Sequence, residues 1–315
     1  MSAIAADRSA SLPRRWTLHG LNSGAIFAAT CRGVAILPRF VSYAIGDVGT
    51  WIAWRVMRET SEALVDNLRV VFPGETAGQL RQRALATLRS YARNVIDFLC
   101  AVNMPGPRAK ELFVLRPADY GRFCEIRARG RGIIFVSGHY GNWEAGSVCM
   151  RHVFDLPLTI LALPDDREEA NSIRREIRDR LGTDTIEVRK SFDTALQIRR
   201  RLADNGIVAM LMDRHIGRDR IAVSLFGRRA WFMRTPALMG YLTGAPLVPC
   251  FIERRNHGGF DVLLGDPIDV DHEAPRDEAI QQAAQAFARQ LEDRIRRHPD
   301  QWFHFYPYWK AQAGD

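Results

Sequence analysis

The spacing of hydrophobic residues changes near residue 110, and this change separates two kinds of predicted structure. Before it, apolar residues such as Leu64 and Leu68 recur at helical intervals. After it, short unbroken apolar runs alternate with longer polar segments. A run such as Ile133–Val136 is typical of a strand buried on both faces of a sheet. The pattern predicts a helical region over 58–109 and an α/β domain over 110–315, with a mainly parallel or mixed sheet flanked by helices.

Five strands and three long helices are expected within this α/β domain. Phe260–Leu264 is expected at an edge of the sheet, and a turn is expected at Phe72–Glu75. The expected buried strands are Ile133–Val136, Leu158–Leu163, Ile207–Met212 and Leu247–Ile252. The expected helices are Asn171–Gly182, Ser191–Asn205 and an apolar stripe from Ile280 to Ile295 that stops before Pro299.

The first part of the chain has a different pattern. Residues 1–19 are polar, small and basic, which predicts a flexible tail. Residues 20–57 are apolar but carry charges such as Arg32 and Asp47, and the uncharged run 20–31 is shorter than the ~20 residues that span a bilayer. We interpret 20–57 as a helical membrane anchor that lies at the surface and is in part re-entrant. A buried helical hairpin is the alternative.

Composition and charge narrow the range of possible binding partners. The net charge is +8 and the pI is near 9.6, with arginine supplying almost all of the positive charge. Such a chain favours an anionic membrane surface or an acidic partner, although biased codon usage also produces arginine. Nucleic acid is not expected, because no zinc-finger spacing, RNP-like segment or separate basic helix is present. The five cysteines have no Cys-x-x-Cys pair, which favours a reducing cytoplasmic setting.

Candidate chemistry follows two of the predicted strands. The run Ile133–Val136 leads through a serine and a glycine to His139, and the run Ile207–Met212 leads directly to Asp213. In open α/β sheets, ligands bind beyond the carboxyl ends of the strands. We therefore expect the site at these two strand ends.

The segment after His139 predicts a turn rather than a continuous helix. Gly138 and Gly141 flank the histidine, Asn142 is suited to cap a helix, and Glu144 would lie in the first turn. The carboxylate could then fold back to the imidazole and orient it as a general base. Two alternatives stay open at this point. The histidine could be structural, or it could bind a metal with His152 or His215, although neither has a familiar ligand spacing.

The segment Ser137-Gly-His-Tyr-Gly-Asn-Trp-Glu144 resembles the His-x4-Asp/Glu signature of glycerolipid-type acyltransferases. More narrowly, it resembles the late acyltransferases of lipid A biosynthesis and the related phosphatidylinositol mannoside acyltransferases. Other segments resemble this family in the same order. They are Asn67–Pro73, Asn171–Gly182, Asp213 with Val223–Gly227, Thr243–Pro249 and His298–Trp302. The chain departs from the family at Arg214-His215 and at Phe303–Tyr306.

The resemblance implies a glycerolipid acyltransferase-like fold and acyl transfer from acyl carrier protein or acyl-CoA to a hydroxyl of a membrane lipid, without a cofactor or metal. The acceptor is expected to be a lipid A precursor, or otherwise another glycolipid or phospholipid. The expected location is the cytoplasmic face of a bacterial inner membrane. A lipid-binding protein without catalytic activity is the alternative from another class.

The expected roles follow from this reaction. His139 is the general base and Glu144 its orienting carboxylate, while Asp213 positions the site. Backbone N–H groups of the turn or a nearby arginine would stabilise the oxyanion. The candidate residues for substrate binding or oxyanion stabilisation are Arg178, Arg180, Asp213, Asn142, Phe226 and Gly227.

Overall fold

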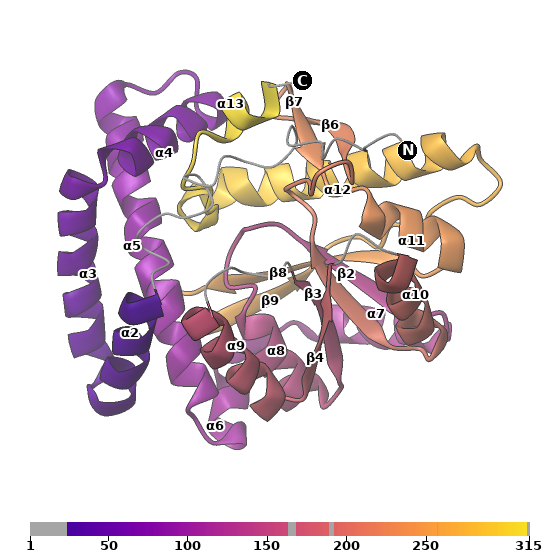
Figure 1. The fold of residues 1–315 in the computed structure, drawn as a ribbon, viewed down its shortest axis with the longest axis horizontal. Coiled ribbons are helices and arrows are strands. Elements are labelled where there is room, and N and C mark those ends of the chain that lie inside the picture. The colour runs from indigo at the N-terminus through magenta and orange to yellow at the C-terminus, as the bar shows by residue number, and fades with distance from the viewer. Residues whose placement is uncertain (1–23, 163–167, 189–191, 257, 314–315) are drawn as a thin grey trace, which may run out of the picture.

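The computed structural model describes residues 24–162, 168–188, 192–256 and 258–313 (Figure 1). The predicted tail 1–19 lies outside the described residues. A seven-stranded sheet has the order β1-β9-β8-β2-β5-β3-β4, and β6 and β7 form a separate two-stranded hairpin. The strands are β1 (Phe113–Leu115), β2 (Ile133–Ser137), β3 (Leu158–Ala162), β4 (Thr183–Glu187), β5 (Ile207–Leu211), β6 (Ile221–Leu225), β7 (Arg228–Phe232), β8 (Leu247–Arg254) and β9 (Phe260–Leu264).

The expectation of a mainly parallel or mixed sheet flanked by helices is confirmed. The five strands from β8 to β4 run parallel to their neighbours, and β9 is antiparallel to β8. Phe260–Leu264 is not at the edge, because the three-residue strand β1 pairs outside it. The other edge strand, β4, has the sequence Thr-Asp-Thr-Ile-Glu, and its polar residues hide it from a search for apolar runs.

Helices cover both faces of the sheet because side chains alternate along each strand. Ile134 and Val136 of β2 belong to the core under α10, α11 and α12, whereas Ile133 and Phe135 pack on the opposite side with residues of α7 and the helical segment η2. The covering helices are α6 (Gly106–Glu111), α7 (Pro117–Ala128), α8 (Ala145–Cys149), η2 (Met150–Phe154), α9 (Glu168–Arg180), α10 (Phe192–Ala203), α11 (Thr235–Thr243) and α12 (Arg276–Arg297).

Four further helices form a layer along one side of the sheet (Figure 1). They are α2 (Gly24–Ile36), α3 (Arg39–Val56), α4 (Arg58–Val71) and α5 (Ala77–Val102). The chain ends with the short helices η3 (Pro299–Gln301) and α13 (Tyr308–Ala313). Leucines of α4 and α5 form a cluster with Phe303 and Phe305, so this layer is fixed to the C-terminal segment. Within the described residues, no helix combines the length and the hydropathy that crossing a bilayer requires.

Candidate active site

The two polar strand ends expected from the sequence lie side by side. Strands β2 and β5 are parallel neighbours, with Ser137 opposite Leu211 at their carboxyl ends. The backbone N–H of Met212 donates to the carbonyl oxygen of Ser137 at 2.7 Å. The chain segments that leave these strands therefore carry His139 and Asp213 to the same point.

The Asp213 carboxylate holds His139 through two hydrogen bonds. Its Oδ1 atom lies 2.6 Å from Nδ1 of the imidazole, and its Oδ2 atom accepts the backbone N–H of His139 at 2.8 Å. Asp213 is fully buried, whereas about a fifth of the His139 side chain (18%) is exposed. The carboxylate thus fixes both the backbone and the ring, and the imidazole keeps an open side.

Two glycines make this arrangement possible. A Cβ atom at Gly138 would lie 3.0 Å from Oδ2 of Asp213, so the absent side chain allows the carboxylate to approach the backbone of His139. Gly141 has a φ of +65°, and a Cβ there would lie 2.3 Å from the carbonyl oxygen of Ile252. The left-handed conformation and the close approach both require glycine at this position.

The C-terminal segment closes the other side of the turn. The N–H of Phe303 donates to the carbonyl oxygen of His139 at 2.7 Å, and the N–H of Gly141 donates to the carbonyl oxygen of Gln301 at 2.8 Å. These bonds bring the ring of His304 to Asp213, where Nε2 lies 2.8 Å from Oδ2. The carboxylate therefore has two imidazole partners, one from each end of the domain.

The surroundings determine the charge of each group. Burial, followed by the nearby positive charge of Arg214, lowers the pKa of His139 below its ordinary value of 6.5. The same two causes lower the pKa of His304 to about 3, so both rings are neutral near pH 7. Burial alone would raise the pKa of Asp213, but its interactions with the two histidines hold that pKa well below 3.8. The site contains an ionised carboxylate between two neutral imidazoles.

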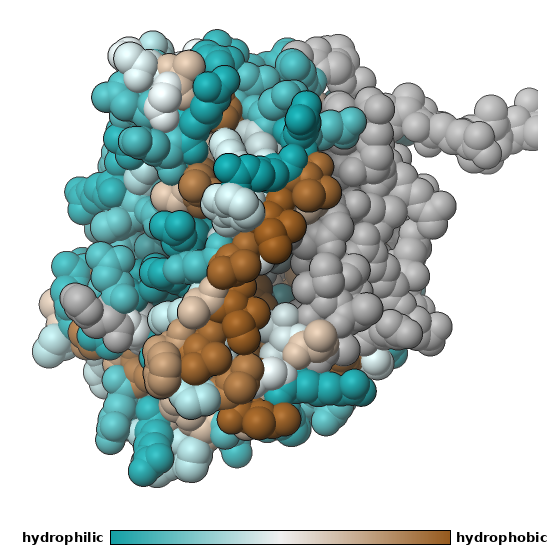
Figure 2. Space-filling view, turned by 90° about the vertical axis from the view of Figure 1, so that its left-hand side faces the viewer, coloured by the Kyte–Doolittle hydropathy of each residue, from teal (hydrophilic) through white to brown (hydrophobic). Residues whose placement is uncertain are grey.

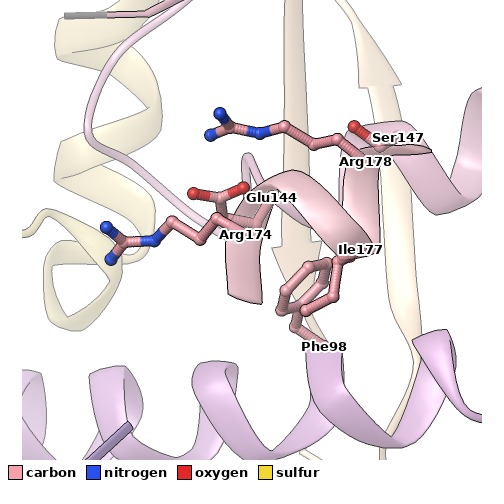
Figure 3. A pocket seen from close by; sticks show the side chains of 6 residues that line it. All are labelled: Phe98, Glu144, Ser147, Arg174, Ile177 and Arg178. Atoms are coloured by element: carbon pink, nitrogen blue, oxygen red, sulfur yellow. The ribbon is translucent and has the colours of Figure 1, made fainter. Parts of the chain in front are cut away.

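The expected contact between Glu144 and His139 is not present. Among the described residues, the carboxylate bonded to the imidazole is that of Asp213. Glu144 is the N-cap residue of α8 and has helical backbone angles, so its side chain leaves the turn in another direction. It lines a small pocket with Arg174 and Arg178 of α9 and Phe98 of α5 (Figure 3). The prediction that the carboxylate folds back to the imidazole was therefore wrong.

Of the other predicted site residues, Arg178 lies at this pocket and the rest lie elsewhere. Arg178 lines the pocket, whereas Arg180 is exposed and does not. Asn142 is buried, and its side chain donates to the carbonyl oxygen of Asn94 at 2.8 Å while accepting from the N–H of Ala145 at 3.2 Å. Asn142 therefore connects the turn to α5 and to the first residue of α8, although the N-cap position itself is occupied by Glu144.

Phe226 and Gly227 form the turn of the β6–β7 hairpin, where both have positive φ angles. The ring of Phe226 packs against Trp302, and Trp302 in turn packs against His304. The path from Phe226 to His139 thus passes through two other rings. Their predicted contribution to substrate binding stays a prediction.

The cluster of two histidines and one aspartate has the ligand types of a metal site. Ligand atoms of His139, Asp213 and His304 lie within 4.8 Å of one another, and imidazole and carboxylate are common metal ligands. However, one ring nitrogen of each histidine is at hydrogen-bond distance from the Asp213 carboxylate. Arg214 also adds a positive charge beside the rings. The geometry suits an acid–base cluster better than a metal centre. His152 and His215, the partners considered from the sequence, do not belong to the group.

Two residues of the site were missed in the sequence. His304 and Arg214 were noted only as departures from a familiar pattern, and neither was given a role. The Nε atom of Arg214 donates to Nδ1 of His304 at 3.2 Å. A signal existed for Arg214, because it directly follows Asp213 at a strand end. No comparable local signal pointed to His304, which follows η3.

Comparison with known proteins gives the family of this chain. Residues 8–311 match the family model for bacterial lipid A biosynthesis acyltransferases, and the chain belongs to this family of acyltransferases. It is similar to a phosphatidylinositol mannoside acyltransferase of Mycolicibacterium smegmatis, with 24% identity over 86% of this chain and 93% of the relative. A phosphatidylinositol mannoside acyltransferase of Mycobacterium tuberculosis is 25% identical over 60% of this chain and 58% of the relative.

Proposed function

We propose that this acyltransferase moves a fatty acyl group from an acyl thioester to a hydroxyl of a membrane glycolipid, with His139 as the general base. The observation that carries the proposal is the 2.6 Å contact between Asp213 Oδ1 and His139 Nδ1. A carboxylate at Nδ1 keeps the proton there and leaves Nε2 as a basic lone pair. A neutral imidazole of this kind can accept a proton from a hydroxyl.

The reaction needs no covalent enzyme intermediate. Nε2 of His139 takes the proton of the acceptor hydroxyl while its oxygen attacks the thioester carbonyl carbon. The tetrahedral intermediate then breaks its C–S bond, and the imidazolium returns the proton to the leaving thiolate. The products are an ester and a free thiol. Asp213 stays ionised and stabilises the transient imidazolium.

The oxyanion of the intermediate needs hydrogen-bond donors, and the turn offers few. The N–H groups of His139, Gly141 and Asn142 already donate to Asp213, Gln301 and Ile252 respectively. We therefore assign the oxyanion, or a phosphate of the substrate, to the arginine pocket. Nε of Arg178 is buried there without a hydrogen-bond partner.

Glu144 has a different role in this mechanism from the one expected in the sequence. It shares the pocket with Arg174 and Arg178, and Figure 3 shows its carboxylate between their side chains. A carboxylate in that position attracts and orders guanidinium groups. We propose that Glu144 keeps Arg178 directed at the substrate, while Asp213 orients His139.

The acceptor has two candidates with shared chemistry. A lipid A precursor is the first, because the matching family model describes lipid A biosynthesis acyltransferases. A phosphatidylinositol mannoside type of glycolipid is the second, because the relatives above are acyltransferases for such lipids. Both candidates are glycolipids that carry phosphate, which suits an arginine-lined site. The donor is acyl carrier protein or acyl-CoA, and each also carries phosphate.

The surface of α3 supports a position at the membrane. Most exposed large apolar side chains of the described residues lie on α2, α3 and the link between them. They are Ile36, Leu37, Phe40, Ile45, Val48, Trp51, Ile52 and Val56, and we call this set the α3 patch. Figure 2 shows a hydrophobic band on the side of the molecule where these helices lie. Large apolar patches on a protein surface mark interaction sites.

The two faces of α3 differ in a way that is opposite to an ordinary surface helix. Ser42 and Thr50 are the buried residues of α3, and a Cβ at Gly46 would lie 3.1 Å from Ile96 of α5. Small and polar residues thus face the protein, while large apolar residues face outward. The exposed Arg32 and Arg55 lie near the two ends of the patch. We propose that the patch enters the anionic cytoplasmic face of a bacterial inner membrane.

The reaction is tested with the full chain, labelled acyl carrier protein or acyl-CoA, and lipid extracts. The wild-type protein should add one acyl chain to a glycolipid, detected by mass spectrometry, and the mass of the product identifies the acceptor. His139→Ala should reduce transfer by about 10³-fold or more. His215→Asn is the matched control, since the ring of His215 has one hydrogen-bond partner among the described residues, the carbonyl oxygen of Gly217. Full activity in His139→Ala, or lipid binding without transfer, would reject the proposal.

A further inference from the structure

A chain of hydrogen bonds runs from Arg214 to His139 through two intermediate residues. Arg214 Nε donates to His304 Nδ1 at 3.2 Å, and His304 Nε2 lies 2.8 Å from Asp213 Oδ2. The chain ends at the 2.6 Å contact between Asp213 Oδ1 and His139 Nδ1. Because His304 and Asp213 are almost fully buried, water has little access to the interior of this chain.

Arg214 is itself held in place. Its Nη2 atom donates to the carbonyl oxygen of Phe303 at 3.1 Å, and its guanidinium lies over the ring of Tyr306 at 5.0 Å from the centroid. Phe303 directly precedes His304 in the chain, and Tyr306 follows it two positions later. The direction of the Nε–H bond towards His304 is therefore fixed by the same segment that positions the histidine.

The chemistry of a guanidinium gives this contact a direction. Arginine has five N–H donors and no acceptor, so the Nδ1 atom of His304 can meet it only as an unprotonated lone pair. A neutral imidazole then carries its one proton on Nε2, facing Asp213. The other tautomer would place two donors against each other at Arg214 and a lone pair against the carboxylate. Both contacts would be repulsive.

We propose that Arg214 is a positioning residue that sets the proton positions along this chain. This inference rests on the proposed function of His139 as the base. With the proton of His304 directed at Oδ2, and the N–H of His139 on the same oxygen, Oδ1 is left for the Nδ1–H of His139. The Nε2 lone pair of His139 is then free for the substrate. Arg214 thus acts on the base through two residues without touching the reacting atoms.

A competing role for Arg214 is electrostatic. Its positive charge could bind the oxyanion or a phosphate of the lipid directly, without any effect on the tautomer of His304. The two roles make different demands on the side chain. Lysine keeps the charge but lacks the planar Nε–H, whereas methionine has similar length and neither property. Comparing the two substitutions separates charge from proton placement.

The test is a double-mutant cycle with His304→Gln. The amide nitrogen of glutamine always carries hydrogen, so it can donate to Asp213 without help from Arg214. In the wild-type background, Arg214→Met and Arg214→Lys should each lower kcat about tenfold, with KM for donor and acceptor nearly unchanged. In the His304→Gln background, the same substitutions should change kcat by less than about twofold. Thermal melting checks that every variant is folded.

Two results of the kcat comparison would overturn the inference, and a third concerns KM. One is full activity in Arg214→Lys, which would assign the effect to charge. The other is an equal loss from Arg214→Met in both backgrounds, which would show that Arg214 does not act through His304. A rise in KM for the lipid acceptor, with kcat unchanged, would likewise assign Arg214 to substrate binding.

A second readout separates this inference from the proposed function. The ring ¹⁵N chemical shifts of His304 report its tautomer without any turnover. The wild-type protein should show a proton on Nε2 alone, and Arg214→Met should show a proton on Nδ1 as well. If wild-type protein transfers no acyl group while the tautomer still follows Arg214, the proposed function fails and the control of proton position stands. An unchanged tautomer in Arg214→Met would reject the inference.

Discussion

Nδ1 of His139 lies 2.6 Å from Oδ1 of Asp213, although 74 positions separate the two residues in the chain. The carboxylate that orients the imidazole therefore comes from the segment after the neighbouring strand β5 rather than from the motif that contains the histidine. Glu144, the acidic residue of that motif, faces an arginine-lined pocket. The two carboxylates consequently have separate tasks, and substitution of each should have a different effect.

Asp213→Asn should be far more damaging to kcat than Glu144→Gln. The amide has nearly the same shape, but it cannot stabilise an imidazolium or fix the tautomer of His139, so kcat should fall by about 10²–10⁴. Glu144→Gln should mainly raise KM, because it loosens the arginines of the pocket. Steady-state kinetics with labelled donor and acceptor measures both. An equal fall in kcat for both variants, with unchanged KM, would return Glu144 to the role predicted from the sequence.

The pH dependence of activity should reflect the lowered pKa of His139. The base must be neutral, so kcat/KM should fall as the pH decreases through a value below the ordinary 6.5. Arg214→Gln removes a positive charge that opposes protonation, and the acid limb should move to higher pH. The profile is measured from about pH 5 to pH 8, with His215→Asn as a control. A wild-type limb above 6.5 would contradict this account of the site.

Stability should fall on mild acidification because His304 stays neutral in the folded protein. The pKa of His304 is lowered from 6.5 to about 3. Below pH 6.5 the unfolded chain takes up a proton that the folded chain does not. The free energy of unfolding should therefore decrease between those values, by at most about 1.4 kcal/mol per pH unit for this group, and should be constant above 6.5.

His304→Gln should remove this contribution. Urea unfolding of the wild type and the variant at several pH values above about 4.5 isolates it, since the low pKa of Asp213 adds its own loss only in stronger acid. The expected result is a shallower decrease of stability in the variant. Identical slopes for the two proteins would mean that His304 is protonated in the folded state.

The α3 patch should bind anionic vesicles. The double substitution Ile45→Asp and Val48→Asp places two charges on exposed residues of the patch. Since burial of each apolar side chain contributes about 1.5–3 kcal/mol, vesicle binding should fall by about 100-fold or more. Leu242→Asp is a matched control, because Leu242 is also exposed but lies on α11. Unchanged sedimentation with vesicles would show that the patch does not face the bilayer.

Gly141→Ala should damage both folding and activity. Alanine would bring its Cβ to 2.3 Å from the carbonyl oxygen of Ile252, in addition to the strain of a positive φ. Gly130→Ala is the control, because Gly130 has a similar φ of +68° and no atom within 4 Å of the added Cβ. The free energy of unfolding of the control should fall by only about 1–2 kcal/mol. Gly141→Ala should lower the free energy of unfolding by more than this and should also lower kcat. Equal losses of stability in the two variants would mean that the backbone of the turn shifts to accommodate the added Cβ.

The sequence by itself determined the local features of this protein. Apolar runs predicted β2, β5 and β8, and the polar residues that follow the first two predicted His139 and Asp213 at strand ends. Gly141 was recognisable as a turn residue, and Asn142 as a residue that accepts a backbone N–H near the start of a helix. Each of these inferences depends on neighbours within a few positions, because strand burial, turn angles and helix caps are short-range properties of the backbone.

Tertiary structure decided which of these groups meet. The order of the strands places β5 beside β2, and that pairing gives His139 the carboxylate of Asp213 in place of Glu144. The return of the C-terminal segment adds His304 at 91 positions from Asp213. Such contacts depend on how apolar surfaces of distant elements are buried together, and no local pattern encodes the result. The network around His139 is therefore a property of the packed domain.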